Sequence, residues 1–282
     1  MHRMPTRPLC WPASWWVPFS FIRLSQTGKE GFVSRYLCIA CEVFARPLYS
    51  IAATTPNVID IQLMQRSLHD EPSRMRPKLQ KKIDFIEDRG YEAVLLGYGL
   101  CGSGTMGLQA RNIPIVIPRV HDCIAMLLGS PKRYDEEFEK TPGTYWYSQD
   151  FAERADETNR FASLGPISDE GLAKQYEAFL THYGRENADY LMETLGSWQA
   201  RYERAAFIDM GLLTPDGYKD SLGNEADRRG WTFEMLAGDL LLLKGLLNGD
   251  WAHKDLKNYI AIPPGHTLDI TYDKHIFRCT PG

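Results

Sequence analysis

The chain alternates short runs of apolar residues with longer segments whose apolar residues recur every three or four positions. Apolar runs cover residues 36–40, 58–63, 93–98 and 113–117, and helical spacing covers 77–89. A strand buried in a parallel sheet has a continuous apolar run, and helix-sized connections between strands favour parallel βαβ units. The pattern therefore predicts an α/β fold with mainly parallel sheets.

The second half of the chain repeats this pattern. Residues 205–209, 231–236 and 258–262 are predicted strands, and 216–229 is a predicted helix. We expect two Rossmann-like βα lobes with a cleft between them. The expected boundaries are 34–150 for the first lobe, 151–203 for a helical connection and 204–282 for the second lobe.

Residues 1–33 differ from the rest of the chain. They contain Trp11, Trp15 and Trp16, and prolines interrupt their apolar run. No small-residue cleavage pattern follows, so a secretory signal is disfavoured. We expect a disordered extension or a start assigned too far upstream, with a membrane-surface or partner-binding segment as a further alternative.

Charge and cysteine content restrict the class of protein. The net charge of −4 argues against a broad nucleic-acid surface, which normally needs a basic stripe. No apolar stretch is long enough to span a bilayer, so we expect no membrane partner. Six cysteines in 282 residues are too few for a disulfide scaffold and favour a cytoplasmic protein. The charge and the cysteine content are also compatible with a homo-oligomer.

Three thiols follow predicted strands. Cys41 ends the first strand, Cys101 lies after the third, and Cys123 lies after the fourth together with His121. Parallel strands bring the loops at their carboxyl ends to one edge of the sheet. Cysteine and histidine are ligands for zinc or iron, so the pattern predicts a metal site made by these four residues.

Other residues near these loops are candidates for catalysis or ligand binding. Cys38 is excluded, because alternation along a strand points it into the core. His121, Asp122 and His69 are candidate catalytic residues. Gly99, Gly102 and Gly104 would let the backbone approach a cofactor or metal closely. The alternative is that these cysteines simply pack, since cysteine is among the most buried residue types, and that His69 is a surface residue before a proline turn.

Several of these segments resemble one known family. They are ACEVF at 40–44, Leu68-His69, YGLCGSGTMGL at 98–108, PRVHDCIAMLLGSPKRY at 118–134, PGTYW at 142–146, GDLLLLKGLLNGDW at 238–251 and AIPPG at 261–265. Together they resemble the family catalogued as domain of unknown function 1638, from about residue 34 to 265. The resemblance implies an association with corrinoid-dependent methyltransferase systems that act on methylamines and betaines.

Three functions are consistent with these features. The first is a metal-dependent protein of one-carbon metabolism that transfers or removes a methyl group of a small methylated substrate, with zinc, iron or an iron–sulfur cluster. The second is a non-catalytic accessory, or a redox-activating partner, of a corrinoid protein. The third is a metal-free thiol enzyme with Cys101 or Cys123 as nucleophile and His121 as base.

Overall fold

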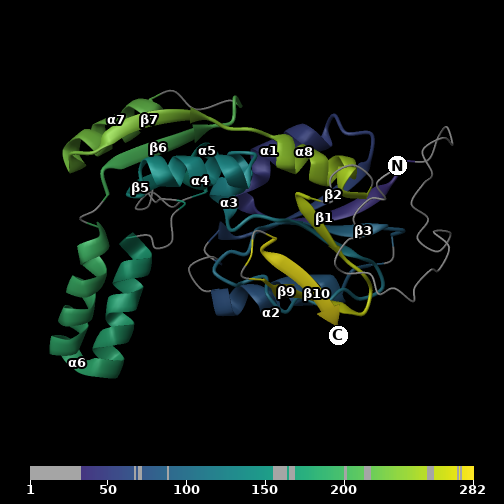
Figure 1. Ribbon diagram of the computed structural model, residues 1–282, viewed down its shortest axis with the longest axis horizontal. Coiled ribbons are helices and arrows are strands. Elements are labelled where there is room, and N and C mark those ends of the chain that lie inside the picture. The colour runs from purple at the N-terminus through teal and green to yellow at the C-terminus, as the bar shows by residue number, and fades with distance from the viewer. Residues whose placement is uncertain are drawn as a thin grey trace, which may run out of the picture. The chain divides into compact units, whose positions relative to one another are not determined.

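A computed structural model gives the fold. It describes residues 33–66, 68, 72–87, 89–154, 164, 169–199, 202–212, 217–252, 257–271, 273 and 275–282. Residues 1–32 of the expected extension therefore lie outside the described residues. His69 lies outside them as well. The chain is a mixed α/β protein in two compact units (Figure 1). Of the described residues, those of 33–41, 47–122 and 241–282 form the first unit, and those of 42–46 and 123–240 form the second.

Five strands form the sheet of the first unit. Their order is β2 (Val58–Met64), β1 (Arg35–Cys41), β3 (Ala93–Gly97), β4 (Ile115–Pro118) and β8 (Tyr259–Ile262). The first four are parallel, and only β8 runs antiparallel, against β4. The prediction of a mainly parallel α/β sheet is confirmed.

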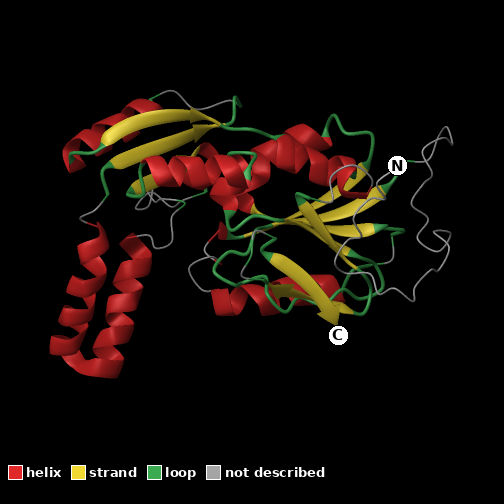
Figure 2. Cartoon of the chain, viewed as in Figure 1, coloured by secondary structure: helices red, strands yellow, loops and turns green. Residues whose placement is uncertain are grey.

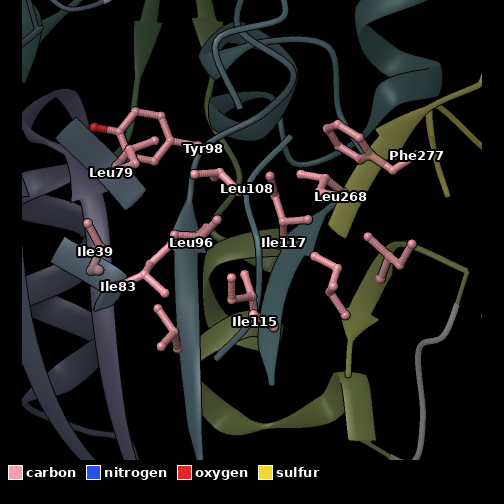
Figure 3. Packing of buried hydrophobic residues seen from close by; sticks show 14 of the residues in the cluster. Ile39, Leu79, Ile83, Leu96, Tyr98, Leu108, Ile115, Ile117, Leu268 and Phe277 are labelled. Carbon is pink, nitrogen blue, oxygen red and sulfur yellow. The ribbon is translucent and has the colours of Figure 1, made fainter. Parts of the chain in front are cut away.

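Apolar residues on one face of this sheet form the core. Ile39, Leu96 and Ile117 point from β1, β3 and β4 toward helix α2 (Pro72–Asp84) and the hairpin of β9 (His266–Ile270) and β10 (Phe277–Pro281) (Figure 3). The opposite face is covered by helix α8 (Leu241–Asn248), four of whose leucines are buried. The sheet is thus buried on both faces, as its continuous apolar strands require.

The second unit contains a separate three-stranded sheet. Its order is β5 (Thr144–Ser148), β6 (Arg204–Asp209) and β7 (Thr232–Ala237), all parallel. Its helices include α4 (Pro131–Lys140), α6 (Asp169–Gln199) and α7 (Tyr218–Arg229) (Figure 2). Helix α6 is a pair of helical arms joined at Gly184, whose φ of 76° is not helical. Ser130 caps α4, because its Oγ accepts a hydrogen bond from the Arg133 amide at 3.4 Å.

The shorter elements lie between these strands and helices. They are the 3₁₀ turns η1 (Glu42–Phe44) and η4 (Asp250–Ala252) and the helices α1 (Ala45–Ala52), α3 (Cys123–Leu127) and α5 (Gln149–Glu153). The units differ from the expected boundaries at 150, 203 and 204. Strand β5 belongs to the second sheet, and residues 241–282 return to the first unit, where β8 pairs with β4. The cleft stays a prediction.

Candidate functional site

The carboxyl ends of β1 and β3 define the candidate site in the first unit. The chain passes from β1 to β2 on one side and then to β3 on the other side of β1. In open parallel sheets, ligands bind outside the carboxyl ends of strands at such a reversal of strand order. Cys41 is the last residue of β1, and Cys101 lies four residues beyond the end of β3. Both thiols therefore lie at the edge where a ligand is expected.

The loop after β3 is paired with the loop after β4. The Leu100 amide donates to the Val120 carbonyl at 3.0 Å, and the Cys101 amide donates to the His121 carbonyl at 2.9 Å. Gly99 makes this possible, because a Cβ there would lie 2.8 Å from the Val120 carbonyl oxygen. This pairing brings the Cys101 loop beside the segment that carries His121 and Asp122.

Cys101 interacts electrostatically with two other candidate residues. Burial raises the pKa of its thiol to about 12, and a hydrogen bond from the Gly99 backbone lowers it. Charge interactions with Cys41 and Asp122 also act to raise this pKa. Cys41 and Cys101 thus follow neighbouring parallel strands, and the Cys101 loop is paired with the segment that precedes Asp122.

The remaining predicted site residues are placed less specifically. The His121 side chain is exposed to solvent, and Cys123 begins α3 at the start of the second unit. Gly102 is exposed with a φ of 61°, whereas Gly104 is buried, with its amide hydrogen-bonded to the Cys101 carbonyl at 3.0 Å. Their proposed role in ligand binding stays a prediction.

The cysteines are not arranged as a complete metal centre. Among the residues that the structure describes, no three His, Cys, Asp or Glu side chains are grouped so that they could hold a metal ion. Two thiols and Asp122 are nonetheless donors that zinc accepts. The centre made by Cys41, Cys101 and Cys123 stays a prediction. Cys38 is fully buried in β1, as expected, and burial raises the pKa of its thiol to about 12.

Arg119 supports this edge of the sheet and was given no role by the sequence. Its buried guanidinium donates through Nε to the Tyr259 carbonyl at 3.2 Å, and through Nη1 to the carbonyls of His275 and Phe277, both at 2.6 Å. Desolvation lowers the pKa of Arg119, and Asp273 raises it. The only sequence signal is its position directly after a buried strand. Arg119 fixes the end of β4 to β8 and β10.

A second titratable residue that the sequence did not indicate lies in the second unit. The buried carboxylate of Asp150 accepts a hydrogen bond from the Arg46 amide at 2.9 Å and so caps the first turn of α1. Burial raises the pKa of Asp150 to about 6, although the Arg46 hydrogen bond lowers it. The Arg46 side chain forms a bidentate ion pair with Glu153, at 2.7 and 2.8 Å.

The fold and the site define an α/β protein with a pair of thiols at the carboxyl edge of a mainly parallel sheet. The chain belongs to the family described as "Protein of unknown function (DUF1638)", whose model matches residues 63–247. This range includes Cys101, His121, Asp122 and Cys123 but begins after Cys41, and it is narrower than the expected 34–265. No curated protein and no solved structure matches the chain. Within the described part of the chain, no helix is both long and apolar enough to cross a membrane.

Proposed function

We propose that the chain is a metal-dependent protein of one-carbon metabolism, with a zinc or iron ion bound by Cys41 and Cys101. The proposal depends on one observation: Cys41 ends β1, and Cys101 lies in the loop after the neighbouring parallel strand β3, where Ala40 pairs with Gly97. Thiolates are the preferred ligands of zinc and of iron–sulfur clusters. A pair of thiols at a ligand-binding edge supports metal binding better than simple packing does.

The donor types fit a zinc site with an open position. Catalytic zinc sites use three protein ligands and leave the fourth position to water or substrate. Cys41 and Cys101 would supply two ligands, and His121, Asp122 or Cys123 would supply the third. Zinc bound there would polarise a methylated substrate or activate the acceptor of its methyl group.

The protein's own residues would bind the ion and handle the proton. Burial keeps the Cys101 thiol protonated at neutral pH, and a bound cation favours its ionised form. The exposed His121 imidazole would accept the proton that is released at one of its ring nitrogens. A metal-free thiol enzyme is less well supported, because it needs a thiolate at neutral pH and burial opposes this at Cys101.

The substrate and partner follow from the family resemblance. We propose a small methylated amine or betaine as substrate and a corrinoid protein as partner. A non-catalytic accessory of that corrinoid protein would bind it with fixed stoichiometry and show no turnover. An iron–sulfur centre would instead indicate electron delivery to the corrinoid.

Metal analysis of anaerobically purified protein tests the proposal. We expect about one zinc or iron per chain, and the absorption spectrum separates colourless zinc from a brown cluster. Cys41→Ala and Cys101→Ala should each lose most of the metal. Cys38→Ala is the matched control in the same strand, and it should retain the metal. Cys123→Ala tests the three-cysteine prediction.

The absence of metal from the wild-type protein, even after incubation with zinc, would refute the proposal. Equal metal content in the Cys38, Cys41 and Cys101 variants would also refute it, because binding would then occur elsewhere.

A further inference from the structure

Cys101 has an uncommon backbone conformation. Its φ is 48°, and Gly102 and Ser103 follow with φ values of 61° and 70°. A non-glycine residue is strained in this left-handed region, since its Cβ crowds the following carbonyl group. Such a conformation persists only where surrounding contacts hold it, and it is often found at functional sites.

Thr105 makes the contacts that hold this turn. Its side chain is fully buried, and its hydroxyl donates to the Gly99 carbonyl at 3.0 Å and is 3.4 Å from the Leu100 carbonyl. The Gly104 amide donates to the Cys101 carbonyl at 3.0 Å. The hydroxyl thus connects the end of the turn to its beginning, with Cys101 between.

The hydroxyl also fixes the residue that hydrogen-bonds to the Cys101 sulfur. Gly99 receives the Thr105 hydrogen bond through its carbonyl group, and its backbone also hydrogen-bonds to the thiol of Cys101. Without the Thr105 hydroxyl, the Gly99 carbonyl would lose this hydrogen-bond donor, and Thr105 would no longer hold Gly99 in place. The thiol would then lose its fixed position beside Cys41 and Asp122.

We propose that Thr105 is a positioning residue whose hydroxyl holds the Gly99–Cys101 turn and thereby places the Cys101 thiol for binding a soft metal ion. The identity of the ligand rests on the function proposed above, whereas the placement of the thiol rests only on the geometry of the turn. Second-sphere residues of this kind typically change metal affinity by about 10- to 100-fold when they are replaced.

The test compares variants of the full chain. Thr105→Val keeps the size of the side chain and removes the hydroxyl, Thr105→Ser keeps the hydroxyl, and Thr105→Ala is a second variant without it. Thr144→Val is the control for lost stability: Thr144 is also a buried threonine, in the second unit, and its hydroxyl donates to the Thr141 carbonyl at 2.6 Å and accepts from Arg204 Nε at 2.9 Å.

Two measurements separate positioning from general stability. The first is the rate at which iodoacetamide alkylates Cys101 in zinc-free protein at one fixed pH, resolved by mass spectrometry. The second is the zinc dissociation constant, measured by competition with a coloured chelator. We expect Thr105→Val and Thr105→Ala to speed alkylation of Cys101 severalfold and to weaken zinc binding by about 10- to 100-fold. Thr105→Ser should behave as wild type.

The other outcomes would each refute either the positioning role of Thr105 or the proposed function. Unchanged alkylation of Cys101 in both variants that lack the hydroxyl would refute the positioning role. An equal increase in Thr144→Val, or in Thr105→Ser, would also refute it, since the effect would then reflect lost stability or altered packing. If wild-type protein binds no zinc, the proposed function fails, and the alkylation rates still decide the role of Thr105.

Discussion

Asp150 should make the stability of this protein fall as the pH rises from about 4 to 7. Its pKa is raised from 3.8 to about 6 in the folded protein, mainly because the carboxylate is buried. Each pKa unit corresponds to about 1.4 kcal/mol, so ionised Asp150 lowers the free energy of unfolding by up to about 3 kcal/mol at pH 7. Well below pH 3.8 the group is protonated in both states and this loss is absent, and at pH 4 most of it is absent.

Asp150→Asn removes the charge and keeps an oxygen that can accept the Arg46 hydrogen bond. We expect this variant to match wild type near pH 4 and to exceed it by up to about 3 kcal/mol at pH 7. Asp150→Ala has no acceptor, so the part-buried Arg46 amide loses its partner. It should be about 1–3 kcal/mol less stable than Asp150→Asn throughout the range.

Urea unfolding of the full chain between pH 4 and 8, followed by tryptophan fluorescence, measures these differences. Glu153→Gln is a control of opposite sign. Burial raises the pKa of Glu153, but hydrogen bonds from Arg46 and Gln149 outweigh burial and lower it. Its loss should therefore destabilise the protein at neutral pH and have less effect as the pH falls. A constant difference between Asp150→Asn and wild type across the range would refute the reasoning.

Three further substitutions test the packing described above. Arg119→Met should lower the free energy of unfolding by at least about 2 kcal/mol, measured by urea unfolding, because three carbonyl groups, two of them buried, lose this donor. Gly99→Ala should cost about 1–3 kcal/mol in the same assay, since its Cβ would lie 2.8 Å from the Val120 carbonyl oxygen and force the paired loops apart. Gly223→Ala in α7 should instead add up to about 1 kcal/mol, because its Cβ would meet Phe233 at an ordinary 3.7 Å. Equal effects of the two glycine substitutions would contradict the packing argument.

Local patterns were sufficient to predict the strands of the five-stranded sheet and β6 and β7 of the second sheet, but not the hairpin of β9 and β10. The alternation of side chains along β1 correctly placed Cys38 in the core. The grouping of Cys41 with Cys101 was predicted because parallel strands share one carboxyl edge. These inferences needed only the periodicity of a strand and one rule of topology.

The remaining features depend on contacts between residues far apart in the sequence. Residues 259–262 form an apolar run, and such a run is compatible with a parallel or an antiparallel strand. The direction of β8 therefore could not be predicted from the sequence. Helix α2 begins at Pro72, earlier than the expected 77, and it contains Pro77, which sequence rules disfavour inside a helix. The role of Thr105 depends on a hydrogen bond across a turn of three left-handed residues, and no periodic pattern reveals such a turn.

The return of the chain to its first sheet imposes an order on folding during synthesis. Ile117 of β4 pairs with Ile260 of β8, and 143 positions separate them. At about 5–20 residues per second, the ribosome needs roughly 7–29 seconds to add those residues. Until then β4 lacks the neighbour that closes its edge, and an apolar strand edge without a partner promotes aggregation. The second unit, almost all of which is synthesised in that interval, can therefore be complete before the first.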